Sequence, residues 1–267
     1  GAPQGIVVDL ALGTATDAYG DTDTLLNIEH IEATNMGDLI NGSDVRNRLK
    51  GKDGDDTLFG NAGFDTIFGG AGDDRIEGGT GHDQIHGNSG DDFLRGNKGN
   101  DVVLGGSGDD YLNGGGDDDL LDGGNGNDTI EADKGDDVVF GGRGNDFITA
   151  GGGDDIVIGG SGNDEIFGNK GNDTFVVDTA GDRVIERSGN GTDLIRAEVD
   201  YTLPDGSATA FVENLRMQGG KGDIDGSMIA DLFAAGEFQK IADYCVNDVE
   251  LVRRVHRRMQ IALGEAA

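Results

Sequence analysis

A single aliphatic residue recurs every nine positions along the middle of the chain, between stretches rich in glycine and aspartate. The run begins at Leu58, continues through Ile67 and Ile76, and ends with Phe175 in the same phase. It defines fourteen consecutive nonapeptides over residues 51–176 with no insertion or deletion, the first of which reads GKDGDDTLF. A fixed short period of this kind predicts a solenoid in which each repeat packs on its neighbours.

The other positions of the repeat predict its local structure. Position 6 is Asp in all fourteen units, position 4 is Gly except at Asp117, and position 1 is Gly except at Ala132 and Ala150. Glycines at positions 1, 2 and 4 permit the positive φ angles of a tight turn, and Asp or Asn at position 5 also tolerates them. Positions 7–9 are expected to form a short strand with its central side chain turned inward.

This unit predicts an all-β fold in which two nonapeptides make one coil of eighteen residues. Units of equal parity then stack as parallel strands, roughly 4.8 Å apart. A glycine-rich, acidic composition can also indicate disorder, but drift in a low-complexity sequence would not preserve the phase of the repeat.

Charge changes the picture of what stabilises such a stack. Asp and Glu number 52 against 20 Lys and Arg, giving a formal net charge of −32. This charge disfavours nucleic acid and anionic membranes and attracts cations, and oxygen-rich sites suit Ca²⁺. Stacking aligns the position-6 carboxylates in two columns, where neighbours about 5 Å apart repel by about 3 kcal/mol at an effective dielectric constant of 20. The aliphatic core is thin, so we hypothesise that the segment folds only when divalent cations bind between its coils.

Other classes of chemistry have little support in the sequence. Cys245 is the one cysteine, which excludes an intrachain disulfide, and no segment is apolar enough to span a bilayer. Residues 1–13 lack the basic start and long apolar run of a cleaved signal peptide, although a trimmed N-terminus would look the same. No zinc signature or nucleophile elbow occurs, and no helix follows the glycine-rich strings as a nucleotide loop would require. We therefore expect a structural protein and not an enzyme.

The nonapeptide G-G-x-G-x-D-x-U-x, where U is aliphatic, resembles the repeat of the RTX (repeats-in-toxin) haemolysin-type calcium-binding proteins. The resemblance implies a right-handed parallel β-roll with each Ca²⁺ between two turns of equal parity, held by backbone carbonyls and position-6 carboxylates. It offers twelve sites between turns, or about a dozen ions, with the turn at Asp117 in doubt. The implied carboxylate ligands are Asp56, Asp65, Asp74, Asp83, Asp92, Asp101, Asp110, Asp119, Asp128, Asp137, Asp146, Asp155, Asp164 and Asp173. The implied carbonyl ligands are Gly54, Gly63, Gly72, Gly81, Gly90, Gly99, Gly108, Gly126, Gly135, Gly144, Gly153, Gly162 and Gly171.

The flanks of the array resemble caps, so we divide the chain into an N-terminal cap with degenerate repeats (1–50), the array (51–176), a C-terminal β flank (177–227) and a helical tail (228–267). The degenerate units 33–41 and 42–50 keep Ile40 and Leu49 but lose most turn glycines, and Asp38 is expected to be a weak ligand. Further strands are predicted at 6–10, 24–29, 174–178, 182–186, 192–196 and 212–215.

The tail 228–267 leaves three readings open. It is near charge balance, and Asn247 to Glu250 resembles a capping box that opens an amphipathic helix. The tail could be a helical cap or a segment for partner docking or self-association, or an uncleaved C-terminal signal for type I secretion, which RTX proteins typically use. Residues 241–249, with Tyr244 and Asp248, also resemble the third motif of DEDDy-type 3′–5′ exonucleases, but no upstream segment supplies that family's other carboxylates.

The resemblance implies a secreted or cell-surface module that folds on binding external Ca²⁺ and serves as a structural, adhesive or export-coupled domain. Two alternatives stay open: an accessory domain of a larger secreted protease, lipase or epimerase, and a surface-layer or phage-associated structural protein.

Overall fold

The computed structural model describes residues 5–186, 191–197, 199, 216 and 217. The chain divides into two units, Gly1–Leu215 and Arg216–Ala267, and the second contributes only the strand β23 (Arg216–Met217) to the description. The strand predicted at 212–215 and the helices predicted in 228–267 lie outside the described residues. No helix long and apolar enough to cross a membrane occurs in the part of the chain that the structure describes.

Every element described in the first unit is a β-strand. The strands are β1 (Val7–Asp9), β2 (Thr14–Thr16), β3 (Thr22–Thr24), β4 (His30–Glu32), β5 (Leu39–Asn41), β6 (Arg48–Asp53), β7 (Thr57–Ala62), β8 (Thr66–Ala71), β9 (Arg75–Thr80), β10 (Gln84–Ser89), β11 (Phe93–Lys98), β12 (Val102–Ser107), β13 (Tyr111–Gly116), β14 (Leu120–Asn125), β15 (Thr129–Lys134), β16 (Val138–Arg143), β17 (Phe147–Gly152), β18 (Ile156–Ser161), β19 (Glu165–Lys170), β20 (Thr174–Val177), β21 (Arg183–Ile185) and β22 (Leu194–Ala197).

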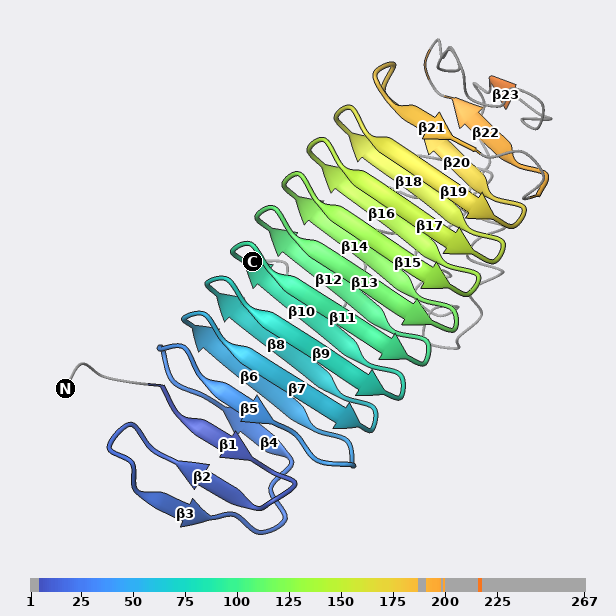
Figure 1. The fold of residues 1–267 in the computed structure, drawn as a ribbon. Helices are drawn as coiled ribbons and strands as arrows, with labels where there is room; N and C mark the ends of the chain where they lie inside the picture. The colour runs from blue at the N-terminus through green and yellow to red at the C-terminus, as the bar shows by residue number, and fades with distance from the viewer. Residues whose placement is uncertain (1–4, 187–190, 198, 200–215, 218–267) are drawn as a thin grey trace, which may run out of the picture. The chain divides into compact units, whose positions relative to one another are not determined.

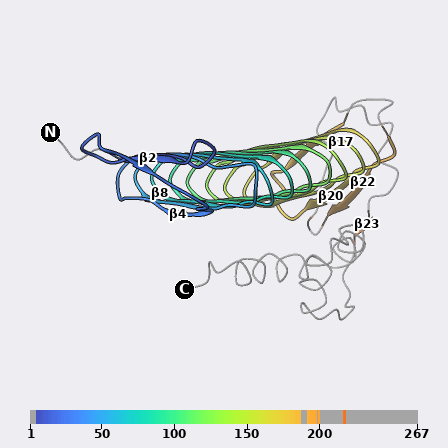
Figure 2. The same cartoon turned by 90° about the horizontal axis from the view of Figure 1, so that it is seen from below.

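These strands form the two facing sheets of a parallel β-solenoid (Figures 1 and 2). Odd-numbered strands from β21 down to β5 make one sheet, which β1, β2 and β3 complete, and even-numbered strands from β22 to β4 make the other. Each array strand pairs in parallel with the strand two further along, so that Leu94 of β11 lies beside Ile76 of β9 and Leu112 of β13. The predicted coil of eighteen residues, with units stacked by parity, is confirmed.

The array strands are twice as long as the sequence predicted. Each complete one spans six residues, positions 7–9 of one unit and positions 1–3 of the next, as in β7. The glycine-rich start of each unit was assigned to the turn, but its backbone continues the ladder: Lys52 pairs with Gly70 and Asp53 with Ala71. Only positions 4–6 therefore lie outside the strands.

The core is the predicted column of position-8 side chains. Each of them, from Leu58 to Phe175, is fully buried between the two sheets. Along β12, β14, β16 and β18 the side chains at positions 7 and 9 are also buried, among them Val138 and Phe140. Because neighbouring side chains of a strand point to opposite faces, this sheet buries apolar surface on both of its faces there.

The N-terminal end of the solenoid is closed by a change of strand direction. The predicted strand at 6–10 is confirmed as β1, which pairs in parallel with β5. The segment 24–29 is not the predicted strand, because β3 ends at Thr24 and β4 begins at His30. Strands β2 and β3 run antiparallel and end the sheet with the exposed polar residues Thr22 to Thr24. A short polar edge strand of this kind discourages pairing with another chain.

The parallel stacking continues past the array at its C-terminal end. Strands β20, β21 and β22 lie within the predicted ranges 174–178, 182–186 and, apart from Ala197, 192–196. Residues Val184 and Ile195 extend the buried column beyond Phe175.

Removal of one core side chain tests the contribution of this column. We expect Leu94→Ala to lower the free energy of unfolding in saturating calcium by about 2–5 kcal/mol, because the side chain is fully buried and leaves a cavity. The matched control is Leu12→Ala, whose side chain is 77% exposed. Denaturant unfolding measures both, and equal losses would contradict the assignment of the core.

Candidate metal centres

The turns of the array share one backbone conformation. The residue at position 2 and the residue at position 4 have positive φ in all fourteen units. Asp117, where the position-4 glycine is missing, has φ 76° and adopts the same left-handed conformation, so its turn is not an exception. Positions 1 and 5 of the array do not adopt positive φ, which corrects the expectation for both.

One oxygen of each position-6 carboxylate ties its coil to the coil before it. The amide of Asp74 donates to Oδ1 of Asp92 at 2.8 Å, and the amide of Asp92 donates to Oδ1 of Asp110 at 2.8 Å. The pattern repeats through all fourteen units at 2.6–2.9 Å. The carboxylates therefore stand in the two predicted columns.

The second oxygen of each of these carboxylates is buried and unsatisfied. Within residues 51–176, all of which the structure describes, no hydrogen-bond donor reaches Oδ2 of any of the fourteen aspartates. Their exposed fractions are 1–3%. A buried charged oxygen without a partner is strongly unfavourable, and native proteins contain few of them. Fourteen such oxygens at one repeat position form a repeated donor set that suits a hard cation.

The glycine at position 1 leaves space for that ligand. A Cβ atom placed on Gly114 would lie 2.5 Å from Oδ2 of Asp119 and 2.9 Å from the carbonyl oxygen of Ala132, the position-1 residue of the next coil. The strand pairing agrees with a space at position 1. Residues at positions 7, 8, 9, 2 and 3 pair with the equivalent residues of the next coil, but the residue at position 1 has no pairing partner in this ladder. We call the space between a position-6 Oδ2, the bare Cα at position 1 and the next position-1 carbonyl the inner turn site.

Burial raises the pKa of every array aspartate at position 6. Desolvation is the largest cause, neighbouring carboxylates add to it in most units, and the hydrogen bond from the amide of the preceding coil opposes it. The pKa is raised to about 7 for Asp92, about 8 for Asp110 and about 9 for Asp119. Burial in the fold thus disfavours the negative charge that these side chains carry in water.

The turns of the N-terminal cap close the same space with hydrogen bonds. The position-2 amides of Thr34 and Ser43 donate to the side chains of Asp38 and Asn47, each at 2.7 Å, and the hydroxyl of Thr34 also donates to Asp38. Neither Thr34 nor Ser43 has positive φ. Asp38 was predicted to be a weak ligand, but its carboxylate already accepts these bonds, and we count it with the cap.

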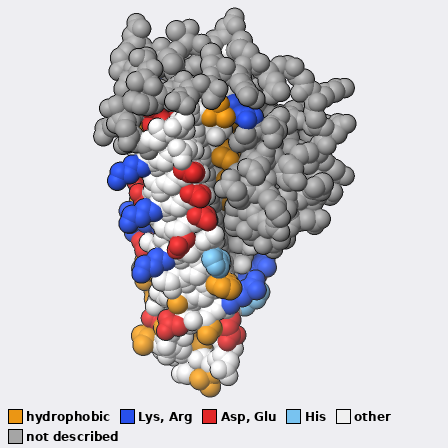
Figure 3. Space-filling model, turned by 90° about the vertical axis from the view of Figure 1, so that its right-hand side faces the viewer, with side chains coloured by type: hydrophobic (Ala, Val, Ile, Leu, Met, Phe, Trp, Pro, Cys, Tyr) orange, Lys and Arg blue, Asp and Glu red, His pale blue; other side chains and the backbone are white. Residues whose placement is uncertain are grey.

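A second ladder lies on the outside of the turns. The side chain of Asp118 accepts the amide of Asp136 at 2.9 Å, and Asp136 accepts that of Asp154 at 2.8 Å. Asp136 and Asp154 are exposed and Asp118 is half-buried, and Figure 3 shows a row of acidic side chains that follows the array. Exposed carboxylates are solvated, so this row does not share the constraint on the buried columns.

The sequence predicted the position-6 aspartates as ligands, and the structure places them in two buried columns, but the prediction did not include every oxygen around the inner turn site. The predicted position-4 carbonyls stack on the next coil: Gly54 O would lie 2.6 Å from a Cβ atom on Gly72. The carbonyl at position 1 was missed. The near-invariant glycine at position 1 could have indicated this carbonyl. We attributed that glycine to the conformation of the turn and not to the space that it leaves beside the carboxylate.

A family model for the RTX calcium-binding nonapeptide repeat matches the chain in overlapping segments over residues 50–183, about half of its length. The matched segments are 50–85, 86–121, 113–148, 122–157, 140–175 and 149–183. The chain belongs to this family of calcium-binding repeat proteins, and its partners include Ca²⁺. No curated protein matches the chain.

Acidification should favour the metal-free roll. Each position-6 pKa is raised in the fold above its ordinary value of 3.8, so the fold binds more protons than the unfolded chain, and its stability falls as the pH rises through about 6 to 9. We expect calcium-free protein to show more β signal in far-UV circular dichroism near about pH 5 than near about pH 9. Protein saturated with calcium is the control and should show little change. A metal-free signal that grows with pH would contradict the burial of these carboxylates.

Proposed function

We propose that the chain is a calcium-triggered folding module that works outside the cell as a structural, adhesive or export-coupled domain. The observation that carries the proposal is the set of fourteen buried, unpartnered Oδ2 atoms. Protons or hard cations can neutralise them, and of these a cation also binds the neighbouring carbonyl oxygens.

The proposed ligands of each ion are the position-6 carboxylates and the backbone carbonyls of the two turns between which it lies. The carbonyls are the position-4 glycines predicted from the sequence together with the position-1 residue of the next coil. Twelve inner turn sites lie between two units of the array, so we propose about a dozen ions. Ala132 and Ala150 each place a methyl group at position 1, and both are fully buried. Sites beside them are narrower.

We propose that calcium triggers folding because the folded array places buried carboxylates in close columns over a thin apolar core. The unfolded chain exposes the same carboxylates to water and does not have this penalty. Sites with few carboxylates per ion suit the affinities of extracellular modules, about 10⁻⁴ to 10⁻³ M. Such affinities would keep the chain unfolded at low internal calcium and fold it outside, as export requires.

The proposed role is structural and not catalytic. The position-6 side chains serve the stacking of coils through Oδ1 and the inner turn sites through Oδ2. A repeated site of this kind shows no asymmetry that would single out one unit as a reaction centre.

A calcium titration tests the switch. Chelated protein should lack most of the β signal in far-UV circular dichroism, and the signal should rise cooperatively near millimolar calcium, because ion binding and folding are coupled. Magnesium is the control, since it requires a smaller octahedral site and dehydrates reluctantly. A full β signal in far-UV circular dichroism in excess chelator at neutral pH would contradict the proposal.

Two neighbouring aspartates provide a matched test of the ligand role. Asp92→Asn keeps an oxygen for the amide of Asp74 but loses the charge at the inner turn site, so the free energy of unfolding in saturating calcium should fall by about 1–3 kcal/mol. Asp91→Asn makes the same change of charge at an exposed position and should cost less than about 0.5 kcal/mol. Equal costs in denaturant unfolding would argue against Asp92 as a ligand.

A further inference from the structure

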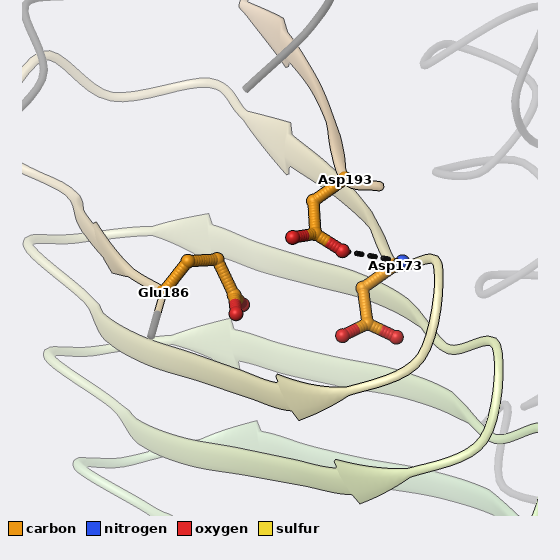
Figure 4. Close-up of side chains that lie close together, drawn as sticks. All are labelled: Asp173, Glu186 and Asp193. Carbon is orange, nitrogen blue, oxygen red and sulfur yellow. Dashed lines mark hydrogen bonds between the residues drawn. The ribbon is translucent and has the colours of Figure 1, made fainter. Parts of the chain in front are cut away.

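The column that contains Asp173 ends differently from the rest of the array. After Asp173, the next coil carries Glu186 at position 1, where the array has Gly or Ala, and Asp193 in the place of position 6 after two additional residues. One carboxylate oxygen from each of Asp173, Glu186 and Asp193 lies within 4.8 Å of the others, and all three residues are buried (Figure 4).

Glu186 brings a carboxylate oxygen close to a position-1 glycine, where the array has a backbone carbonyl oxygen. At Gly114 the site faces Oδ2 of Asp119 and the carbonyl of Ala132. At Gly168, the last position-1 glycine of the same column, a Cβ atom would lie 2.6 Å from Oδ2 of Asp173 and 2.5 Å from Cζ of Phe175, and Oε1 of Glu186 is also next to it. The terminal site therefore has one carboxylate more than an array site, which lies between two position-6 aspartates.

Asp173 supplies independent evidence that a ligand belongs there. Its Oδ1 accepts the amide of Asp155 at 2.9 Å, and its own amide donates to Asp193 at 3.0 Å. Its Oδ2 has no hydrogen-bond partner among the described residues, and the residue is 1% exposed. Figure 4 shows the three carboxylates close together, with the hydrogen bond from the Asp173 amide to Asp193.

The other column shows that this ending is not a general property of the fold. Beyond Asp164, position 1 of the next coil is the buried Val177, which adds no oxygen ligand from its side chain. The following position-6 residue, Asp182, accepts the amide of Thr179 at 3.2 Å and so resembles the closed turns of the N-terminal cap. One column ends in a closed turn and the other in three carboxylates.

We propose that Asp173, Glu186 and Asp193 form a terminal cation site distinct from the repeat sites, which binds a hard cation more tightly than they do. Affinity at oxygen sites rises with the number of charged ligands, so the additional carboxylate favours Ca²⁺ and favours a trivalent lanthanide more strongly. This proposal depends on the array binding calcium, but it does not depend on calcium triggering folding. The terminal site requires only that the last coils are folded.

Terbium luminescence tests the site in the full chain saturated with calcium. We expect the first equivalent of Tb³⁺ to bind about 10- to 100-fold more tightly than later equivalents, because one site carries the additional charge. Glu186→Gln should abolish this tight phase. Glu29→Gln makes the same change of charge on an exposed residue and should retain it.

Circular dichroism in calcium shows whether each variant is folded, and the chelated protein tests the folding trigger separately. If Glu186→Gln does not fold, Glu186→Asp tests the site instead. This variant keeps the negative charge but shortens the side chain by one methylene group, so it should weaken the tight phase of Tb³⁺ binding. The proposal is overturned if wild-type protein shows no distinct tight equivalent. It is also overturned if the folded Glu186 variant titrates like wild type.

Discussion

The structure depends on one unfavourable arrangement, two columns of buried carboxylates that each leave an oxygen without a partner. Each aspartate at position 6 holds the coil before it through Oδ1, so the aspartates cannot turn toward solvent without losing the contact between coils. The remaining features of the repeat follow from this constraint. Positive φ at positions 2 and 4 opens the turn, and glycine at position 1 makes room beside Oδ2.

The cap shows that the same coil can be built without this constraint. In units 33–41 and 42–50, Thr34 and Ser43 close the turn with their own amides, and Asn47 replaces a carboxylate by a neutral amide. Ile40 and Leu49 nevertheless continue the buried column of the array. The fold of the coil is therefore set by the strand side chains, whereas the turn residues decide whether hydrogen bonds satisfy its interior or leave Oδ2 available to the proposed ions.

The sequence predicted the features that repeat and missed those that depend on three dimensions. A strict period gave the coil, the parity of stacking, the buried column and the aspartate columns, because each copy confirms the others. It could not separate glycine required for conformation at position 4 from glycine required for space at position 1. That distinction depends on the next coil. Glu186 was missed for the same reason, since its alignment with Gly168 spans the last unit of the strict array and one unit beyond it.

The direction of the aspartate contacts supports the proposal that many weak sites act together as one folding switch. Oδ1 of Asp92 binds the amide of the preceding coil, while Oδ2 faces a site shared with the carbonyl of Gly105 in the next coil. An ion there fixes a side chain that in turn orders the coil before it. Nearest-neighbour coupling of this kind propagates along a solenoid, so filling one site favours filling the next. Cooperative folding then requires no single site of high affinity, only an end at which the stack is held.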